Sequence, residues 1–300
     1  MPAVRGFVCA IALAGVGFLP NSAHAGDPTA GSKATNSRVA RDEAAQSIPY
    51  DRLPAEMRSR VVAVVNNPSI FRRLPIASID CDPDLYLLLV RNPEIVIDIW
   101  QLMGITNMAL TRTGPNQFRA ADGQGTVGTL EFAYRSADMH VIYSTGTYDG
   151  SLSPAKIRGE SVVVLKTEYV RNASGQIRIV NRLDVFLHLD NVGIEWIAKT
   201  LQPLLGKTAD HNFAETASFV ASLSHTAETN PAGVGRLANR LPHVDAATRQ
   251  RLGELSAQAS DRADSIRSAM AQPSANRTGT QVTPASAQVR RTDADPYEQP

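Results

Sequence analysis

Two pairs of histidine and aspartate are the residues whose types and spacing could bind a metal or exchange protons. His188 and Asp190 lie two positions apart in the stretch FLHLDNVGIEW, and Asp210 and His211 are adjacent further along the chain. Imidazole and carboxylate groups ligate zinc, and a histidine can act as a general base. A zinc site needs three or four converging ligands, however, and the sequence has neither an H-E-x-x-H motif nor a closely spaced pair of cysteines. We therefore predict no metal site and no cofactor.

The strand that ends in this stretch separates the His188 and Asp190 pair from the expected core. Side chains alternate between the two faces of a strand. One face is aliphatic and consists of Leu183, Val185, Leu187 and Leu189. The other face is expected to be solvated and consists of Arg182, Asp184, Phe186, His188 and Asp190. Asp190 precedes an expected helix and can accept its first N–H groups, and Thr208 or Asp210 can cap the next helix in the same way. These residues are predicted to be helix caps and polar surface.

A glycine-rich stretch, DGQGTVG, matches the spacing of a dinucleotide-binding loop. Gly123, Gly125 and Gly128 fit the pattern G-x-G-x-x-G. In a dinucleotide site this loop joins a strand to a helix, whereas here the strand-like sequence TLEFAYR follows it. We therefore predict a glycine-rich hairpin.

The stretch DCDPD, residues 80–84, places three aspartates at alternate positions, as a calcium loop does. Such a loop also needs glycine at its sixth place and glutamate at its twelfth, where this chain has Leu85 and Arg91. We predict instead that Asp82 caps a helix beginning at Pro83. Cys81, the only cysteine after the first 25 residues, is predicted to be a buried and inert thiol rather than a nucleophile.

The first 25 residues have the features of a secretory signal peptide. Arg5 supplies positive charge, Gly6–Leu19 is an apolar run, and Ala23–Ala25 matches a small-x-small cleavage site. The run is shorter than the roughly 20 apolar residues of a membrane-spanning helix, and a retained anchor is the alternative. We expect a periplasmic or extracellular protein that is cleaved after Ala25 and has no stable transmembrane anchor.

Charge and composition limit the remaining function classes and outline the domains. The sequence has 30 Lys and Arg against 29 Asp and Glu without a basic block, so we expect no nucleic-acid binding. Residues 26–47 and 273–300 have few large apolar side chains and are predicted to be a disordered spacer and a disordered tail. Between them we predict one domain over 48–230, followed over 231–272 by a linker and an amphipathic helix.

Hydrophobic periodicity predicts the order of elements in the domain. Residues 72–80 fit a short strand, and over 105–190 the period is two, with turn signals that separate six strands. Short connections between successive strands imply an antiparallel meander. Helical spacing occurs in four segments: 53–68, 81–104 (two short apolar helices), 191–206 and 209–228.

This order of elements resembles the helix-grip fold of the START-like (SRPBCC) superfamily over about residues 72–230. The resemblance is carried by DPDLYLLLVRNPEIVIDIW, by the strand series from TLEFAYR to RLDVFLHL, and by the helical sequence over 191–224. It implies an α+β protein whose curved antiparallel sheet of about seven strands grips a long C-terminal helix. This chain adds an N-terminal helix and a separate C-terminal helix. The resemblance also implies an apolar cavity between sheet and helix, because members commonly bind lipids, sterols or polyketides, and a minority are enzymes.

Aromatic and methionine side chains are the candidate lining of that cavity. They are Trp100, Met103, Met108, Phe118, Phe132, Tyr134, Tyr143 and Phe219. A mostly apolar cleft with a few polar groups is the usual form of a small-molecule site, and ordinary core packing is the alternative for each residue. The hydroxyls of Tyr134 and Tyr143 could orient a ligand.

Three functions are compatible with these features. The leading hypothesis is an exported, non-enzymatic protein that holds a hydrophobic small molecule or lipid between the sheet and the long helix. The second is an envelope protein–protein interaction module with a solid core, which would use the helix at 245–272 for contacts that include self-association. The third is a dehydratase-like or cyclase-like enzyme that uses Tyr134 or Tyr143 inside the cavity.

Overall fold

The computed structural model describes residues 33–150, 153, 155–171, 177–190, 206 and 208–271. The signal-like segment 1–25, the predicted tail 273–300 and nearly all of the predicted helix 191–206 lie outside these residues. Contacts divide the chain into two compact units, Met1–Ala263 and Asp264–Pro300. The sheet and all helices except the end of the last one belong to the first unit.

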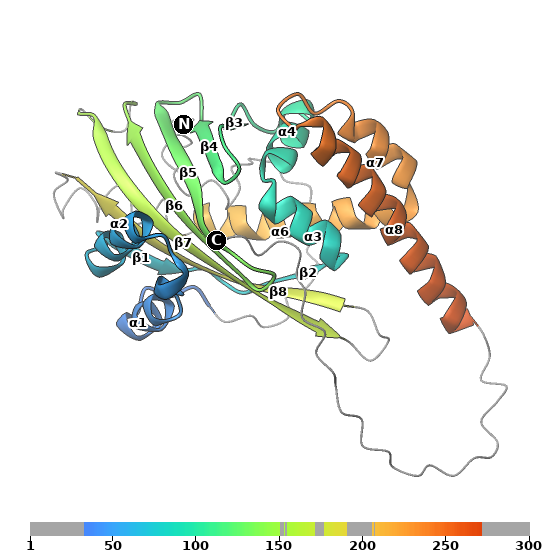
Figure 1. Ribbon diagram of the computed structural model, residues 1–300, viewed down its shortest axis with the longest axis horizontal. Coiled ribbons are helices and arrows are strands. Elements are labelled where there is room, and N and C mark those ends of the chain that lie inside the picture. Colours follow the sequence, from blue (N-terminus) through green and yellow to red (C-terminus); the bar gives the residue numbers. More distant parts are fainter. Residues whose placement is uncertain are drawn as a thin grey trace, which may run out of the picture. The chain divides into compact units, whose positions relative to one another are not determined.

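An eight-stranded antiparallel sheet forms the centre of the first unit (Figure 1). Its strands are β1 (Ile70–Arg73), β2 (Ala77–Asp80), β3 (Ala109–Arg112), β4 (Gln117–Ala121), β5 (Thr126–Arg135), β6 (Met139–Tyr148), β7 (Ile157–Arg171) and β8 (Ile177–Leu189). Their order is β1-β8-β7-β6-β5-β4-β3, and β2 also pairs with β8. Each strand from β3 to β8 therefore lies beside its neighbour in the chain, which confirms the predicted meander.

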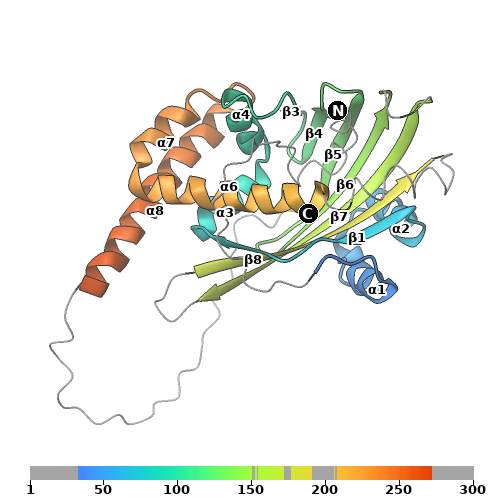
Figure 2. The same cartoon turned by 180° about the vertical axis from the view of Figure 1, so that it is seen from behind.

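Helices cover both faces of this sheet. They are α1 (Arg38–Gln46), the short 3-10 helix η2 (Tyr50–Arg52), α2 (Ala55–Asn66), α3 (Pro83–Arg91), α4 (Glu94–Leu102), α6 (Ala209–Thr229), α7 (Pro231–Ala238) and α8 (Ala246–Ala271). The long helix α6 runs across one face, which we call the inner face, whereas α1 and α2 lie on the opposite, outer face (Figures 1 and 2). The predicted α+β class with a helix-grip arrangement is thus confirmed. Within the described residues, no helix is both long enough and apolar enough to cross a membrane.

Local sequence explains where several elements begin and end. Asp82 caps α3 as predicted, because its Oδ1 accepts from the backbone N–H groups of Asp84 and Leu85, both at 3.1 Å. The strand predicted over 72–80 is instead two strands, β1 and β2, so the sheet has eight strands rather than about seven. Pro75 lies in the gap between them, where a residue without an N–H cannot extend the ladder. The predicted side-chain cap of α6 is wrong, since Thr208 caps no N–H group and Asp210 pairs with Arg72.

The outer face of the sheet is a second core, which corrects two predictions. Residues 26–47 were predicted to be a disordered spacer, but α1 forms within them, because Ala40 and Ala44 bury against this face. The face of β8 predicted to be solvated is also largely covered. Phe186 is fully buried and packs on Phe71 at a ring-centroid distance of 5.0 Å.

A buried ion pair joins α1 to the sheet. Asp184 is completely buried on the outer face of β8, and its Oδ1 accepts from Arg73 Nε at 2.6 Å. The Arg73 guanidinium also donates to the Ala40 carbonyl at 3.0 Å and to Glu43 at 2.8 Å. One side chain therefore neutralises a buried carboxylate and holds a helix carbonyl and a helix carboxylate at the same time.

A one-residue bulge in β5 changes which side chains reach each face. Phe132 pairs with Ile142 and Tyr134 pairs with Val141, so Ala133 has no register partner. Beyond the bulge the alternation is inverted: Tyr134 faces outward, and Arg135, the partner of His140, faces inward. Near the other end of the strand, a Cβ on Gly128 would lie 2.4 Å from the Thr145 carbonyl oxygen, so only glycine permits this close approach of β5 and β6.

The chain after α6 folds onto the domain, whereas a linker was predicted there. Asn230 caps α7 by accepting from the Gly233 N–H at 3.0 Å, with Pro231 as the first helical residue. In α8, three apolar side chains, Leu252, Leu255 and Ala259, are buried. His243, between α7 and α8, donates from its backbone N–H to the buried Asp98 carboxylate on α4 at 2.8 Å.

Replacing Asp184 by Asn should reduce the free energy of unfolding by about 3–5 kcal/mol, because it leaves the Arg73 charge in a largely buried place without its main partner. Asp80 forms the matched control, since its pair with Arg178 is exposed and should contribute less than about 1 kcal/mol. Urea unfolding of both Asn variants measures the difference, and equal losses would contradict a dependence of the outer core on this pair.

Candidate functional site

An apolar cavity of about 90 Å³ lies between α6, the helix pair α3–α4 and the inner face of the sheet. Its lining consists of Ile79, Tyr86, Leu89, Val90, Pro93, Val96, Ile97, Trp100, Ile142, Leu165, Asn181, Leu183, Phe213, Thr216, Ala217 and Val220. From α6 the lining includes two smaller side chains, Thr216 and Ala217, between the larger Phe213 and Val220. Apart from Tyr86, Asn181 and Thr216, every lining side chain is apolar or proline.

A buried hydrogen-bonded trio forms the polar wall of the cavity. The Tyr86 hydroxyl donates to Asn181 Oδ1 at 2.7 Å, and the Thr167 hydroxyl donates to the same oxygen at 3.1 Å. The two hydroxyl oxygens lie 3.0 Å apart. Burial raises the pKa of Tyr86 well above its ordinary value, so the phenol remains neutral and serves as a donor. Neither Tyr86 nor Asn181 was predicted, although a tyrosine within LYLLLV and an asparagine within a strand are polar groups in apolar segments.

The predicted lining residues are distributed differently from the expectation. Trp100 lines the cavity, and Phe219 packs against it edge-on with ring centroids 5.5 Å apart. Met108, Phe118 and Phe132 are buried in the same inner core, outside the cavity wall. Met103 is wrong as a lining residue, because 60% of its surface is exposed just after α4.

Both predicted cavity tyrosines lie on the outer face. Tyr143 is buried in the outer core with Val141 and Val162, and Tyr134 packs against the same core, where its hydroxyl accepts from Arg52 at 3.3 Å. The bulge at Ala133 explains Tyr134, since simple alternation from Phe132 would have turned it inward. The hypothesis of a dehydratase or cyclase that uses these two hydroxyls in the cavity is therefore wrong as it was framed.

The histidines and aspartates around residues 188–211 do not converge. His188 Nδ1 lies 2.7 Å from the Asn67 carbonyl oxygen, and its Nε2 lies 3.6 Å from Asp190. Asp210 forms an ion pair with Arg72 instead. Across the part of the chain that the structure describes, no group of three or more His, Cys, Asp or Glu side chains could hold a metal ion. Cys81 is buried, as predicted, and burial raises the pKa of its thiol to about 12.

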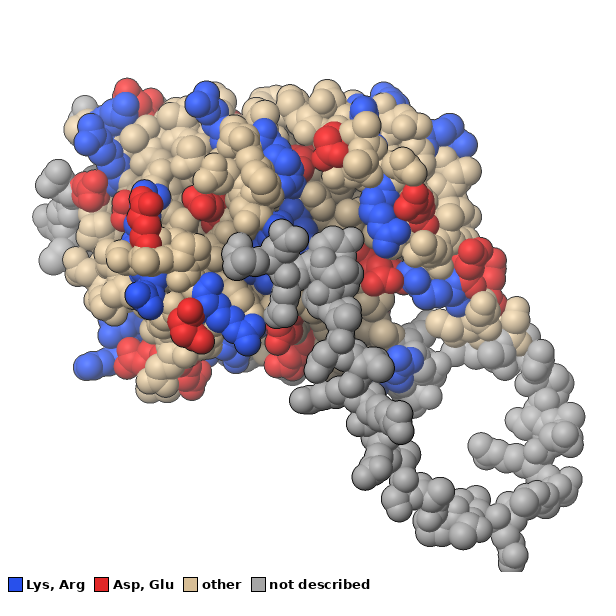
Figure 3. Space-filling view, viewed as in Figure 1, with Lys and Arg blue, Asp and Glu red and all other residues tan. Residues whose placement is uncertain are grey.

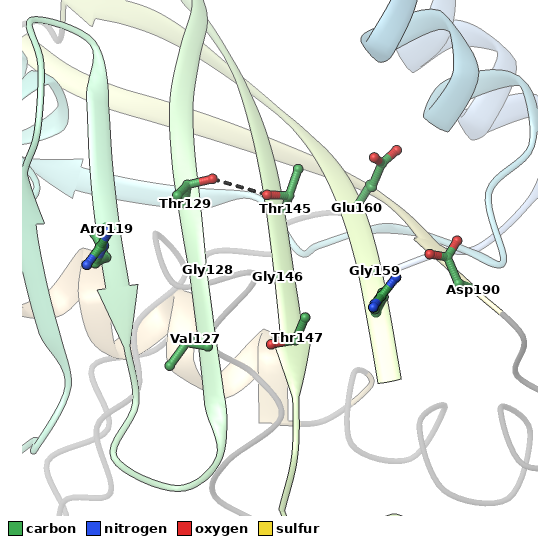
Figure 4. Close-up of a pocket in the computed structure, with 11 residues that line it drawn as sticks. Arg119, Val127, Gly128, Thr129, Thr145, Gly146, Thr147, Gly159, Glu160 and Asp190 are labelled. Atoms are coloured by element: carbon green, nitrogen blue, oxygen red, sulfur yellow. Dashed lines mark hydrogen bonds between the residues drawn. The ribbon is translucent and has the colours of Figure 1, made fainter. Parts of the chain in front are cut away.

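The outer face carries a second hollow, an open groove over β4 to β8 (Figure 4). The predicted glycine-rich hairpin, which connects β4 to β5, leads into it, and Gly128, Gly146 and Gly159 are register partners beneath it. Thr129 and Thr145 point to the same side and their hydroxyl oxygens lie 3.1 Å apart. This groove is open to solvent, whereas small-molecule sites usually enclose most of the ligand surface.

A buried histidine lies at one end of the inner core. His140 on β6 is completely buried, its ring lies edge-on to Phe132 at 6.0 Å between centroids, and neither ring nitrogen has a hydrogen-bond partner among the described residues. Burial and the positive charges of Arg91 and Arg135 lower the pKa of His140 to about 3, opposed by Asp138. The imidazole is therefore neutral at physiological pH.

Comparisons with known proteins identify no family. No family model matches the chain, and no curated protein matches it. Among solved structures, a conserved protein from Geobacillus kaustophilus is 9% identical over 48% of this chain and 93% of its own, with a TM-score of 0.32. Dicamba monooxygenase bound to dicamba is 12% identical over 75% of this chain and 65% of its own, with a TM-score of 0.37. The di-domain ARO/CYC BexL from the BE-7585A biosynthetic pathway is 16% identical over 62% and 53%, with a TM-score of 0.25. At this level the likeness identifies no activity or ligand.

Replacing Tyr86 by Phe should destabilise the chain by about 1–3 kcal/mol, because Asn181 and Thr167 lose a buried partner while the shape is kept. Tyr50 provides the control, since it is not a member of this hydrogen-bonded trio and is only partly buried on the outer side. Denaturant unfolding of Tyr86→Phe and Tyr50→Phe measures both, and a smaller loss for Tyr86→Phe would show that the trio adds no stability.

Protonation of His140 should make stability depend on pH between about 6.5 and 3. The folded pKa is lowered below the unfolded value of 6.5, so the unfolded chain binds a proton in this window that the folded chain does not. Stability is therefore full above pH 6.5, falls as the pH decreases towards 3, and levels off below it. Because one pKa unit is worth about 1.4 kcal/mol, the loss should reach a few kcal/mol.

The difference between the original chain and a His140→Phe variant isolates this contribution, since the acidic residues titrate in both. The variant should lose less stability on acidification from pH 7 to 4 when unfolding is followed by fluorescence. The exposed His225, replaced by Phe, is the control. Parallel pH profiles for the original chain and His140→Phe would refute the assignment.

Proposed function

We propose that this chain is a non-enzymatic protein that binds a small apolar group in the cavity under α6. One observation carries the proposal: protein interiors are close-packed, yet this core retains an apolar space of about 90 Å³ beside a preorganised polar trio. A mostly apolar cavity with a few fixed polar groups is the usual construction of a small-molecule site.

The volume limits what the cavity accepts in this conformation. Sites for drug-sized ligands enclose roughly 300–1,000 Å³, and an engineered cavity of about 150 Å³ in another protein holds benzene or xenon. A cavity of about 90 Å³ suits a single heavy atom such as xenon or a short alkyl group. A lipid, sterol or polyketide would require α6 to move away from the sheet, so we propose a smaller ligand than the sequence suggested.

Membership of the START-like (SRPBCC) superfamily and export are part of the same proposal. The order of strands and helices and the sheet that grips α6 support the first. The signal-like residues 1–25 support export to the periplasm or the exterior. The interaction module is less well supported, because the apolar positions Leu252, Leu255 and Ala259 of its proposed contact helix are used inside the domain. Self-association through α8 would depend on its remaining surface.

Filling the cavity should abolish binding of a small apolar probe. Ala217 lines the cavity from α6, and Ala217→Leu adds three carbons to that space. In the original chain, xenon should shift the methyl resonances of Ile142, Leu165 and Val220, whereas in Ala217→Leu these shifts should vanish. The substitution should also stabilise the chain by about 0.5–2 kcal/mol if the leucine fits without strain.

Ala214→Leu is the matched control, because Ala214 is an exposed residue of the same helix and should leave the xenon shifts unchanged. Mass spectrometry of an organic extract of the protein purified from its own source identifies a bound molecule directly. Unchanged cavity methyls under xenon pressure, together with an empty extract, would overturn the proposed function.

A further inference from the structure

Three buried nitrogen atoms, carried by residues next to the lining of the α6 cavity, have no hydrogen-bond partner among the described residues. Both ring nitrogens of His140 and the Nε of Arg91, in the last turn of α3, are buried without a hydrogen bond among the described residues. Native proteins satisfy nearly all buried polar groups, with ligands or ordered water where protein groups are lacking. The unsatisfied nitrogens therefore indicate a polar occupant.

Positive charge is concentrated around these nitrogens. Partial burial lowers the pKa of Arg135, and the positive charges of Arg91 and Arg112 lower it further. Arg112 is neutralised by the buried Glu94, whose Oε1 accepts from its Nε at 2.8 Å. Within the described ranges, neither Arg91 nor Arg135 forms an ion pair. Figure 3, in the view of Figure 1, shows Lys and Arg side chains gathered in a column between the strands and the helices α3 and α4.

Aromatic rings hold two of these guanidinium groups in place. The guanidinium carbon of Arg112 lies 4.4 Å from the centre of the Phe118 ring, and that of Arg135 lies 5.6 Å from the centre of Phe132. The two rings pack edge-to-face at 6.0 Å. The bulge at Ala133 turns Arg135 to the inner face, where it is the register partner of His140. The cationic groups are thus positioned by the core.

The charged cluster adjoins the apolar cavity. Arg91 lies between two lining residues of the same segment, Val90 and Pro93. His140 pairs with Leu165 on β7 and lies on the same face of β6 as Ile142, and both of these residues line the cavity. The residues that carry these nitrogens are therefore direct neighbours of residues that line the cavity.

We propose that Arg91, Arg135 and His140 bind the carboxylate of a small organic acid whose apolar part occupies the α6 cavity. This inference rests on the proposed function and adds the class of ligand. Guanidinium N–H groups form strong, charge-assisted hydrogen bonds to carboxylate oxygens, and the neutral imidazole of His140 supplies one further N–H donor. The carboxylate of Asp138, in the β5–β6 turn, offsets part of this positive charge, so the uncompensated charge is close to one, which suits a monoanion better than a phosphate dianion.

Four probes separate the apolar and the anionic parts of the site. Butanoate carries both, 1-butanol and xenon carry only the apolar part, and acetate carries the carboxylate with one methyl group. Each is titrated into the full chain while methyl and arginine side-chain resonances are followed by NMR. Butanoate should bind at least about tenfold more tightly than 1-butanol, as expected for charge-assisted hydrogen bonds.

Arg91→Gln and Arg135→Gln should each weaken butanoate binding about tenfold without changing the response to xenon or 1-butanol. Arg135→Lys should retain more affinity than Arg135→Gln, because it keeps the charge. Arg119→Gln is the control, since Arg119 is an exposed arginine on the other face of β4. This variant should bind butanoate with the same affinity as the original chain.

The failures of the two proposals are distinguishable. Equal affinities for butanoate and 1-butanol, or no difference between Arg91→Gln, Arg135→Gln and Arg119→Gln, would overturn the carboxylate site while xenon still reports the cavity. Butanoate that binds no more tightly than acetate would overturn the connection of the carboxylate site to the cavity. If xenon had no effect while acetate binding still depended on Arg91, the proposed apolar cavity site would be overturned. The proposal of an amphipathic ligand would then fail with it.

Discussion

The pairing of β7 with β8 imposes the constraint that organises this protein, because both faces of this ladder must be buried. From Gly159–Leu189 to Arg171–Ile177 the two long strands pair without interruption. Their inner side chains, such as Val163 and Leu183, belong to the core under α6, whereas Val164 and Phe186 belong to the core under α1 and α2. A sheet with two apolar faces needs a helical layer on each. The buried Asp184 remains in this arrangement because Arg73 reaches it from the neighbouring strand.

Much of this architecture could be predicted from local patterns. The six consecutive strands, the helix pair after Cys81 and the long helix over 209–228 follow from hydrophobic periodicity and from the Asp–Pro start of α3. The layer of α1 could not be predicted in this way, since its only apolar residues are Val39, which is exposed, and three alanines. Its stability derives from packing on a face formed far away in the chain. For the same reason Pro231, followed by two nearby glycines, suggested a linker where tertiary contacts stabilise α7.

The candidate site shows a sharper limit of pattern reasoning. Trp100, selected with the other aromatic and methionine side chains, does line the cavity, but the two selected tyrosines lie on the other face. Strict alternation assigns Tyr134 and Arg135 to the correct faces of the sheet only if the bulge at the unpaired residue Ala133 is known. No residue type in that stretch marks a bulge. The tyrosine that does line the cavity, Tyr86, comes from a helix, and its partners Thr167 and Asn181 are brought together by the β7–β8 register.

The interruption of the edge strand at Pro75 bears on the tendency of the protein to aggregate through exposed strand edges. A long strand such as β8 would expose a continuous row of free amide and carbonyl groups if its outer edge were unpaired, and such rows recruit other chains into intermolecular sheets. Here that edge is occupied by two strands of four residues each, with the Leu74 N–H donating to the Leu183 carbonyl oxygen at 2.9 Å between them. The opposite border, β3, is equally short. The described sheet therefore ends on both sides in strands of four residues, and short edge strands are one of the ways in which proteins limit edge-to-edge aggregation. Its central strands, by contrast, are long and rich in valine.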